Sequence, residues 1–238
     1  MIETPRFHLA GEGGLLVELG TRIDPALSAL ARALAARLEE WPEVKETAPS
    51  YASVLVLYDP LATTMESLRG RITAIWAALD PGELLLSRTI ILPVAYGGQY
   101  GPDLEAVADA TDFSAEEVIR RHSATLYLVY LIGFTPGFPY LGGLPPELAT
   151  PRLSTPRTLV PAGSVGIAGS QTGVYSLESP GGWRLIGRTP TLLFDPRRNP
   201  PSLLRAGDQL RFCPLPSSDF SLLAEESARG ERTWEEER

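Results

Sequence analysis

The chain has 238 residues, which suits one large or two small domains, and 44% of them are hydrophobic, enough for an ordinary core. Its formal net charge of −8 argues against a general nucleic-acid binder, because such proteins present basic surfaces. No apolar run approaches the ~18 residues that span a membrane, and the opening MIETPRFHLA lacks the pattern of a signal peptide. We therefore expect a cytoplasmic protein that binds neither nucleic acid nor a membrane.

Three scarce residue types restrict the possible sites. The single cysteine, Cys213, cannot form an internal disulfide, and we interpret it as a small core residue of the strand LRFC. Two histidines, His8 and His122, are too few for a zinc site built on several His and Cys ligands. The single lysine, Lys45, does not follow a glycine, so the phosphate-binding loop GxxxxGK(S/T) is absent. The sequence assigns no metal-binding residue, although magnesium sites made of carboxylates remain open.

The first third of the chain alternates strand and helix patterns. Apolar residues at helical spacing predict two amphipathic helices, the first with Asp24 as its N-cap and Pro25 at its first position, the second from about Thr64 to Leu79. Strands are predicted over residues 14–19, 44–47, 53–59 and 84–94. Strand, helix, strand, strand, helix, strand is the split βαβ order, so we predict a ferredoxin-like domain over residues 1–85.

The second part of the chain is rich in short strand patterns. A helix opens at Ser114, where Ser114 and Glu117 fit a capping box, and the buried strand LYLVYLIGF follows it. Closely spaced strands with turn residues then continue to AGDQLRF, which is typical of a closed or sandwich-like β-domain over residues 86–215. Residues 216–238 form a mostly charged C-terminal tail, for which we predict a frayed helix or disorder.

The stretch from Gly133 to Pro190 combines many glycines and prolines with aromatic residues. Disordered segments lack aromatic residues, so tight turns and short strands are the better interpretation. Loops of this kind hold polar side chains in place, and function concentrates on them. We therefore look for the site here.

Three blocks within this stretch carry a resemblance: GFTPGFPYLGGL, TPRTLVPAGSVGIAGSQTGVY and SPGGWRLIGRTP. They resemble the hallmark run of the allophanate hydrolase subunit 1 family, which includes KipI-like kinase inhibitors and the B subunit of the ATP-dependent 5-oxoprolinase. The family is also similar to one half of the carboxyltransferase domain of urea carboxylase. The resemblance covers about residues 5 to 215, and it implies an α+β fold whose second domain is a cyclophilin-like β-barrel.

The resemblance also implies a function. The chain would be a non-autonomous subunit of a complex that opens the 5-oxoproline lactam to glutamate at the expense of ATP. Its partners would be a homologous cyclophilin-like barrel protein (KipA-like, or the C subunit of 5-oxoprolinase) and the larger A subunit of 5-oxoprolinase. Two alternatives stay open: a KipI-like inhibitor of a sensor histidine kinase, and an allophanate hydrolase or urea carboxylase component. Hydrolysis of allophanate by this chain alone is not expected, because no GxSxG nucleophile motif is present.

Candidate binding residues lie in and around the three blocks. Gln171 lies between glycines, which gives its amide room to meet a ligand, although those glycines also suit bends in a barrel strand. Tyr140 and Tyr175 carry hydroxyls that need partners, whereas Phe134 and Phe138 are interpreted as rings that fill the barrel. Arg157 and Arg188 suit a carboxylate or a phosphate, and the alternative is a structural ion pair.

His122 is the candidate catalytic residue, because it is the only imidazole near the central strand of the second domain. The alternative is a structural histidine at a helix C-terminus, where the helix dipole favours its charged form. We expect all six candidates to converge on one cavity of the second domain.

Overall fold

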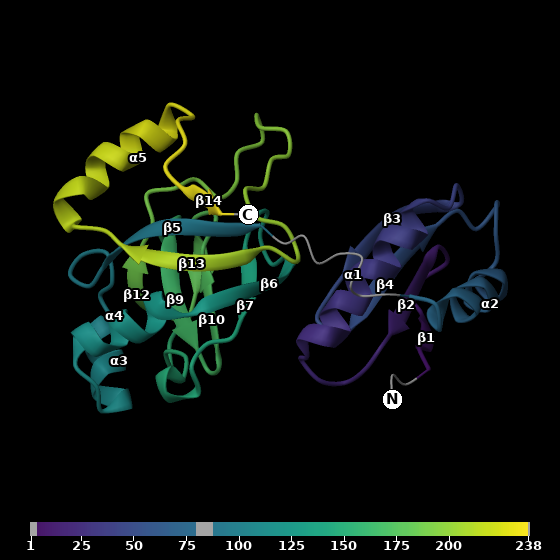
Figure 1. Cartoon of the computed structure of the whole chain (residues 1–238), viewed down its shortest axis with the longest axis horizontal. Coiled ribbons are helices and arrows are strands. Elements are labelled where there is room, and N and C mark those ends of the chain that lie inside the picture. Colours follow the sequence, from purple (N-terminus) through teal and green to yellow (C-terminus); the bar gives the residue numbers. More distant parts are fainter. Residues whose placement is uncertain (1–3, 80–87, 238) are drawn as a thin grey trace. The chain divides into compact units, whose positions relative to one another are not determined.

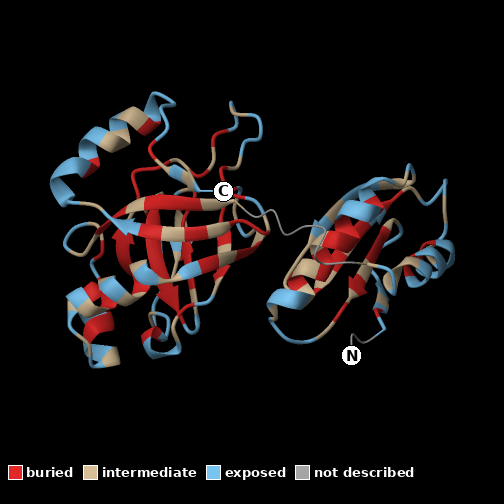
Figure 2. Cartoon of the chain, in the orientation of Figure 1, coloured by how far each residue is buried: buried red, intermediate tan, exposed pale blue. Residues whose placement is uncertain are grey.

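The computed structural model describes residues 4–79 and 88–237. The chain separates into two compact units, Met1–Leu86 and Ser87–Arg238, each with its own sheet (Figure 1). Each unit also has its own buried core, drawn in red in Figure 2. Within the described ranges, no helix is long and apolar enough to cross a membrane.

The first unit is an antiparallel four-stranded sheet with two helices. Its elements are β1 (Arg6–Leu9), β2 (Gly14–Glu18), α1 (Pro25–Glu39), β3 (Val44–Pro49), β4 (Ser53–Tyr58) and α2 (Met65–Trp76). The strand order is β1-β2-β4-β3. Leu30, Leu34 and Leu38 of α1 are buried in one cluster with Val54 and Val56 of β4. The predicted leucine stripe is therefore the face that holds α1 on the sheet.

The ferredoxin-like prediction is not confirmed for this unit. It needed a strand near residues 84–94, but residues 80–87 lie outside the described residues, and β5 (Thr89–Tyr96) belongs to the second unit. The edge position beside β2 is held by β1, through the antiparallel pairing Arg6↔Glu18 to Leu9↔Leu15. The prediction gave β1 no place in the sheet, because RFHL is short. In the structure most of its side chains are exposed.

The second unit contains the remaining described elements. They are β5 (Thr89–Tyr96), α3 (Leu104–Thr111), α4 (Ala115–Ala124), β6 (Leu126–Ile132), β7 (Pro139–Gly142), η2 (Pro146–Leu148), β8 (Arg157–Val160), β9 (Ser164–Ala168), β10 (Gln171–Val174), β11 (Ser179–Gly181), β12 (Arg184–Arg188), β13 (Gln209–Pro214), η3 (Ser217–Asp219), α5 (Phe220–Ala228) and β14 (Glu235–Glu237). Strands β8 and β11 form a separate two-stranded ribbon.

Seven of these strands close into a barrel, as the sequence predicted for a closed β-domain. The order is β12-β9-β10-β7-β6-β13-β5, and pairing of β12 with β5, at Gly187↔Tyr96 and Arg188↔Ala95, completes the circle. Only β13 and β5 run parallel among these neighbours. The interior is apolar, with Val129, Ile167 and Phe212 almost entirely buried.

The C-terminal segment, residues 216–237, is folded, so the predicted fraying or disorder is wrong for these residues. It forms η3, α5 and β14, and β14 pairs antiparallel with β5, Glu235 opposite Ile91. The hydroxyl of Thr233 lies 2.9 Å from that of Thr191, and Trp234 packs against the barrel core. The charged composition of the segment gave no sign that Thr233 and Trp234 contact the barrel. It also gave no sign that the segment pairs with β5.

Three helices begin at side-chain caps, of which Asp24 and Ser114 were predicted as caps and Thr64 only as a helix start. Asp24 accepts from the backbone N–H of Ala26 at 2.8 Å, Thr64 caps α2, and Ser114 accepts from the N–H of Glu117 at 3.2 Å. The predicted capping box is only half formed, because the Glu117 carboxylate binds two arginines instead.

Replacing Ser114 by alanine should lower the free energy of unfolding by about 1 kcal/mol, because the Glu117 N–H loses its acceptor. Urea unfolding measures the change. Ser114→Asp is the matched control, since aspartate is an equally good cap and should retain the stability. Equal losses in both variants would show that the cap contributes nothing.

Candidate functional site

Strand β10 divides the predicted site residues between two faces of the barrel wall. The Oγ1 atom of Thr172 lies 2.9 Å from Nε2 of His122, and His122 stacks on the core residue Phe212. Thr172 therefore points into the barrel. Successive residues of a strand face opposite sides, so Gln171 and Gly173 face outward. The barrel wall separates Gln171 from His122.

His122 is fully buried, and both of its ring nitrogens are engaged. The Thr172 hydroxyl donates to a backbone carbonyl of β9 at 2.9 Å, so its oxygen accepts from Nε2–H of His122. Nδ1 is then the acceptor for the Tyr96 hydroxyl, 2.8 Å away. Burial lowers the pKa of His122 to about 3, so desolvation outweighs the helix dipole and the ring is neutral.

This arrangement favours the structural interpretation of His122. A general base needs a lone pair that can reach a substrate proton, and the lone pair on Nδ1 already accepts from Tyr96 inside the barrel wall. His122 joins the end of α4 to β5 and β10 through Tyr96 and Thr172. It does not meet the other five candidates.

On the outer face, four aromatic rings form a cluster against the barrel wall. Phe138 makes edge-on contacts with Tyr140, Tyr175 and Trp183, at centroid distances of 5.1, 5.5 and 5.8 Å. A Cβ atom at Gly173 would lie 3.0 Å from Trp183 and 3.2 Å from Phe138. The glycine leaves room for these rings, which supports the structural interpretation of the glycines. We call Phe138, Tyr140, Tyr175 and Trp183 the outer aromatic cluster.

Phe134 departs from its prediction as a barrel filler, because 64% of its surface is exposed. Its backbone has φ of 63°, a left-handed conformation that is uncommon for a bulky residue and marks local strain. The loop is held in place because the Ser176 hydroxyl donates to the Pro136 carbonyl at 2.7 Å. The ring of Phe134 meets Phe138 edge-on at 5.5 Å. It therefore extends the outer aromatic cluster into solvent.

Arg157 lies beside the outer aromatic cluster but already has a carboxylate partner. Its Nη2 atom lies 2.7 Å from Oδ1 of Asp103, and Nη1 reaches the Trp183 carbonyl at 3.4 Å. The other carboxylate oxygen of Asp103 accepts from the N–H of Leu185 at 2.7 Å. Arg157 thus forms the structural pair that was the alternative to a ligand role.

Arg188 lies in a different neighbourhood. Its Nε atom donates to the Ala162 carbonyl at 2.8 Å, and its guanidinium lies over the ring of Phe220, 5.7 Å from the centroid. Within residues 4–79 and 88–237, no ion pair of Arg188 with a carboxylate is found. The expected convergence of six residues is therefore not observed: Tyr140, Gln171, Tyr175 and Arg157 gather on the outer face, while His122 and Arg188 lie elsewhere.

Cys213 also differs from its prediction. It is exposed, because Phe212 takes the inward position of β13 and Cys213 the outward one. In the described part of the chain, no group of three or more His, Cys, Asp or Glu residues could hold a metal ion.

Sequence reasoning missed Asp103 and Arg152. Asp103 lies directly before α3, so the sequence marks it only as a helix start, and its partner Arg157 is 54 positions away. Arg152 places its guanidinium 6.0 Å from the Trp183 ring centroid, at the rim of the outer aromatic cluster. The turn-rich segment around Arg152 offered no periodic pattern that would show which way its side chain points.

Comparison with known proteins shows which family this chain belongs to. The model of the carboxyltransferase domain, subdomain C and D, matches residues 5–204. The chain is 42% identical to the B subunit of 5-oxoprolinase from Bacillus subtilis (strain 168), over 91% of this chain and 95% of that protein. It is 45% identical to the B subunit of 5-oxoprolinase from Escherichia coli O157:H7, over 90% of this chain and 97% of that protein.

Two solved structures share the architecture but are longer. TTHA0988 is 37% identical with a TM-score of 0.75; the match covers 86% of this chain but only 40% of that one. Urea carboxylase of Kluyveromyces lactis is 22% identical with a TM-score of 0.79, over 98% of this chain and 24% of that one, and this likeness shows the fold alone. The resemblance drawn from the three sequence blocks is thus confirmed, and the chain belongs to the carboxyltransferase domain family, subdomain C and D.

Proposed function

We propose that this protein is the B subunit of an ATP-dependent 5-oxoprolinase complex, which hydrolyses 5-oxoproline to glutamate. The observation that carries the proposal is the identity of 42% and 45% to two proteins of that name, over nearly their whole length. The partners that we propose are the C subunit, a homologous barrel protein, and the larger A subunit, and ATP is the cofactor of the complex. We place the complex in the cytoplasm.

The outer aromatic cluster, with Phe134 and Gln171, is the surface that we propose for substrate binding. Tyr140 and Gln171 are half-buried on neighbouring strands, and Gly173, two residues after Gln171, is directly opposite Tyr140. Such a diagonal pair is close enough for both side chains to meet one small ligand. Tyr175 packs edge-on against Phe138, and Arg157 donates to the Trp183 carbonyl, so in this proposal both help to position the rings. In this proposal Arg188 and His122 act indirectly, through the stability of the barrel.

Phe134 is the exposed member of this surface, whereas Phe138, Tyr175 and Trp183 are almost fully buried. We therefore propose that another protein of the complex binds at Phe134 and completes the site. An exposed aromatic residue in a strained loop, such as Phe134, is typical of an interaction surface. In this proposal the other proteins of the complex supply catalytic groups. We also propose that the first unit is ferredoxin-like and that the barrel is cyclophilin-like.

Reconstitution tests the proposed function. The A and C subunits from the same organism are mixed with this chain, and glutamate release is measured with 5-oxoproline and ATP. We expect turnover only when all three are present, and none from this chain alone. Equal turnover by the other two proteins without this chain would contradict the proposal. Inhibition of a sensor histidine kinase by this chain, without any effect on 5-oxoproline hydrolysis, would favour the kinase-regulator alternative.

Phe134→Ala should lower the kcat/KM of the reconstituted complex at least about tenfold, because aromatic anchors dominate the energetics of binding surfaces. The isolated chain should keep its stability within about 0.5 kcal/mol, since the side chain is mostly exposed. Leu61→Ala, at a position 97% exposed in the first unit, is the matched control and should change neither quantity. Full activity of Phe134→Ala would remove this loop from the proposed site.

A further inference from the structure

A hollow lies on the barrel, and no residue of the outer aromatic cluster lines it. It has a volume of about 730 Å³, within the range of small-molecule sites. Its walls come from β5, β13, the end of α4 and the C-terminal segment, including α5 and β14. Of the described residues, fifteen line it, and ten of these lie beyond residue 204, where the match to the family model ends. The hollow shares no lining residue with the surface proposed for substrate binding.

The lining combines apolar surface with charged side chains. Ile91, Pro93, Pro214 and Leu223 supply aliphatic surface, and Trp234 supplies an aromatic wall. In ligand sites an apolar lining packs against the body of the ligand, and polar groups orient it.

Three arginines reach this hollow from three separate elements: Arg120 from α4, Arg211 from β13 and Arg232 from the C-terminal segment. The lining carboxylates are Glu235 and Glu237. Among the described residues, three positive and two negative side chains line the hollow, on a chain whose net charge is −8. The three guanidinium groups supply the positive charge that an anionic ligand needs.

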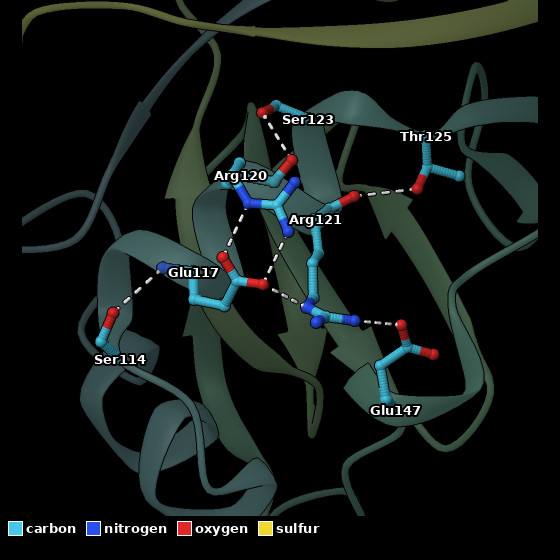
Figure 3. Close-up of polar contacts among 7 residues, drawn as sticks. All are labelled: Ser114, Glu117, Arg120, Arg121, Ser123, Thr125 and Glu147. Carbon is cyan, nitrogen blue, oxygen red and sulfur yellow. Dashed lines mark hydrogen bonds and ion pairs between the residues drawn. The ribbon is translucent and has the colours of Figure 1, made fainter.

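Arg120 is held in position by a network on α4 that Figure 3 shows. The Glu117 carboxylate accepts from Nε and Nη2 of Arg120, both at 2.7 Å, and from Nε of Arg121 at 2.6 Å. Arg121 reaches on to Glu147. The hydrogen bonds from Arg120 and then Arg121 lower the pKa of Glu117 to about 2, so this anchor stays charged above pH 3.

Each of the three arginines keeps hydrogen-bond donors to spare. Nη1 of Arg120 makes no hydrogen bond to a residue of the described ranges. Toward residues 4–79 and 88–237, Arg211 donates only from Nη2, to Glu237 at 2.8 Å. Arg232 uses Nε, which donates to the Trp234 carbonyl at 3.0 Å, while its guanidinium lies over the Trp234 ring. Since a guanidinium has five N–H donors, all three can receive a carboxylate.

We propose that this hollow binds a small monocarboxylate with an aromatic or branched apolar body. The carboxylate is bound by the arginines, with Arg211 exchanging Glu237 for the ligand. The body lies against Trp234 and the aliphatic lining. The folded C-terminal segment is thereby part of a binding site, which accounts for the anchoring of so charged a stretch.

Cys213 provides a reporter for the test, because it is the only cysteine of the chain, is exposed and lines the hollow. The rate of its reaction with the uncharged disulfide 2,2′-dithiodipyridine is measured on the full chain at rising concentrations of 2-naphthoate. We expect a saturable protection that slows the reaction about tenfold. The neutral analogue 2-naphthamide should need about tenfold higher concentrations, because it lacks the charge-assisted hydrogen bonds.

Arg211→Ala should raise the naphthoate concentration needed for half protection about tenfold, because it removes a donor and leaves Glu237 unpaired. Arg232→Ala, at an exposed position, is a second variant in case the first one misfolds. Arg229→Ala is the matched control, since Arg229 pairs with Glu231 on the same segment and does not line the hollow. Equal protection by the amide, or no protection by naphthoate at millimolar concentrations, would overturn the proposal.

Discussion

Replacing Asp103 by alanine should lower the free energy of unfolding of the barrel unit by about 3 kcal/mol. The reason is that one carboxylate satisfies two groups, the half-buried Arg157 guanidinium at 2.7 Å and the buried Leu185 N–H at 2.7 Å. Removal of one partner from a buried ion pair leaves an uncompensated charge, which costs about 3–5 kcal/mol. The Arg157 side chain is 28% exposed, so water replaces part of the loss and we expect the lower limit.

The location of Asp103 explains why this loss should spread. The backbone N–H of Asp103 donates to the Leu185 carbonyl at 2.9 Å, so the two residues are joined twice. The ladder between β12 and β9 shifts register between Leu185 and Gly187, and Gly187 then pairs with β5 to close the barrel. We therefore expect amide hydrogen exchange in β12 and β5 to accelerate in Asp103→Ala before it does so elsewhere in the barrel.

Three further variants make this prediction specific. Asp109 is exposed on α3, the helix that Asp103 directly precedes. Asp109→Ala should therefore change the stability by less than about 0.5 kcal/mol. In Asp103→Asn the side chain can still accept from the Leu185 N–H but has no charge. Its loss of stability should lie between those of Asp109→Ala and Asp103→Ala. Combining Asp103→Ala with Arg157→Met should recover part of the loss, because the unpaired charge disappears. If the double variant is no more stable than Asp103→Ala, the ion pair is not the cause.

The elements of the fold were largely predictable because their signals are local. The caps at Asp24 and Ser114 and the apolar stripes predicted helices that the structure contains. The dense short strands with their turn residues predicted a closed or sandwich-like β-domain, and the structure has the closed form. The errors arose where the structure depends on distant residues. The sequence does not show that the strand predicted near residues 84–94 pairs in the barrel, or that Thr233 and Trp234 anchor the C-terminal segment.

The site was predictable only in part, for the same reason. Tyr140, Gln171 and Tyr175 follow from strand alternation once the inward position of Thr172 is known. That position depends on His122, which lies 50 residues earlier in the chain. Residue type alone made His122 the candidate for catalysis and left the structural alternative open. The burial of His122 and its two hydrogen bonds favour the structural role. Both depend on tertiary structure, which the sequence pattern does not show.

The stability of the barrel unit should fall as the pH is lowered from 7 to 5, and His122 should be a main cause. Burial lowers the pKa of His122 in the folded state to about 3, whereas the unfolded chain has a value near 6.5. Between these values the unfolded state binds the additional proton. The stabilisation is therefore complete above pH 6.5 and is lost progressively as the pH falls towards 3.

The size of the pH effect follows because the unfolded state binds one more proton, on His122, than the folded state. Well inside this window the free energy of unfolding changes by about 1.4 kcal/mol per pH unit, so the fall from pH 7 to 5 is about 2 kcal/mol. The carboxylates with strongly lowered pKa, Glu117 and Asp195, both to about 2, lose their contributions only at lower pH, because unfolded carboxylates titrate near pH 4. The interval from pH 7 to 5 thus isolates the histidine.

Hydrogen exchange in β5 and β13, or urea unfolding of the full chain, measures this dependence. His122→Gln should be less stable at pH 7, since Tyr96 and Thr172 lose the geometry of their ring partner, but its stability should change little between pH 7 and 5. His8→Gln is the matched control: His8 is exposed, pairs with Glu18 in the first unit, and should leave the barrel dependence unchanged. The ring resonances of His122 should stay those of a neutral imidazole down to pH 5. A His122 that titrates near 6.5 in the folded protein would contradict the buried neutral assignment and would return His122 to the candidates for proton transfer.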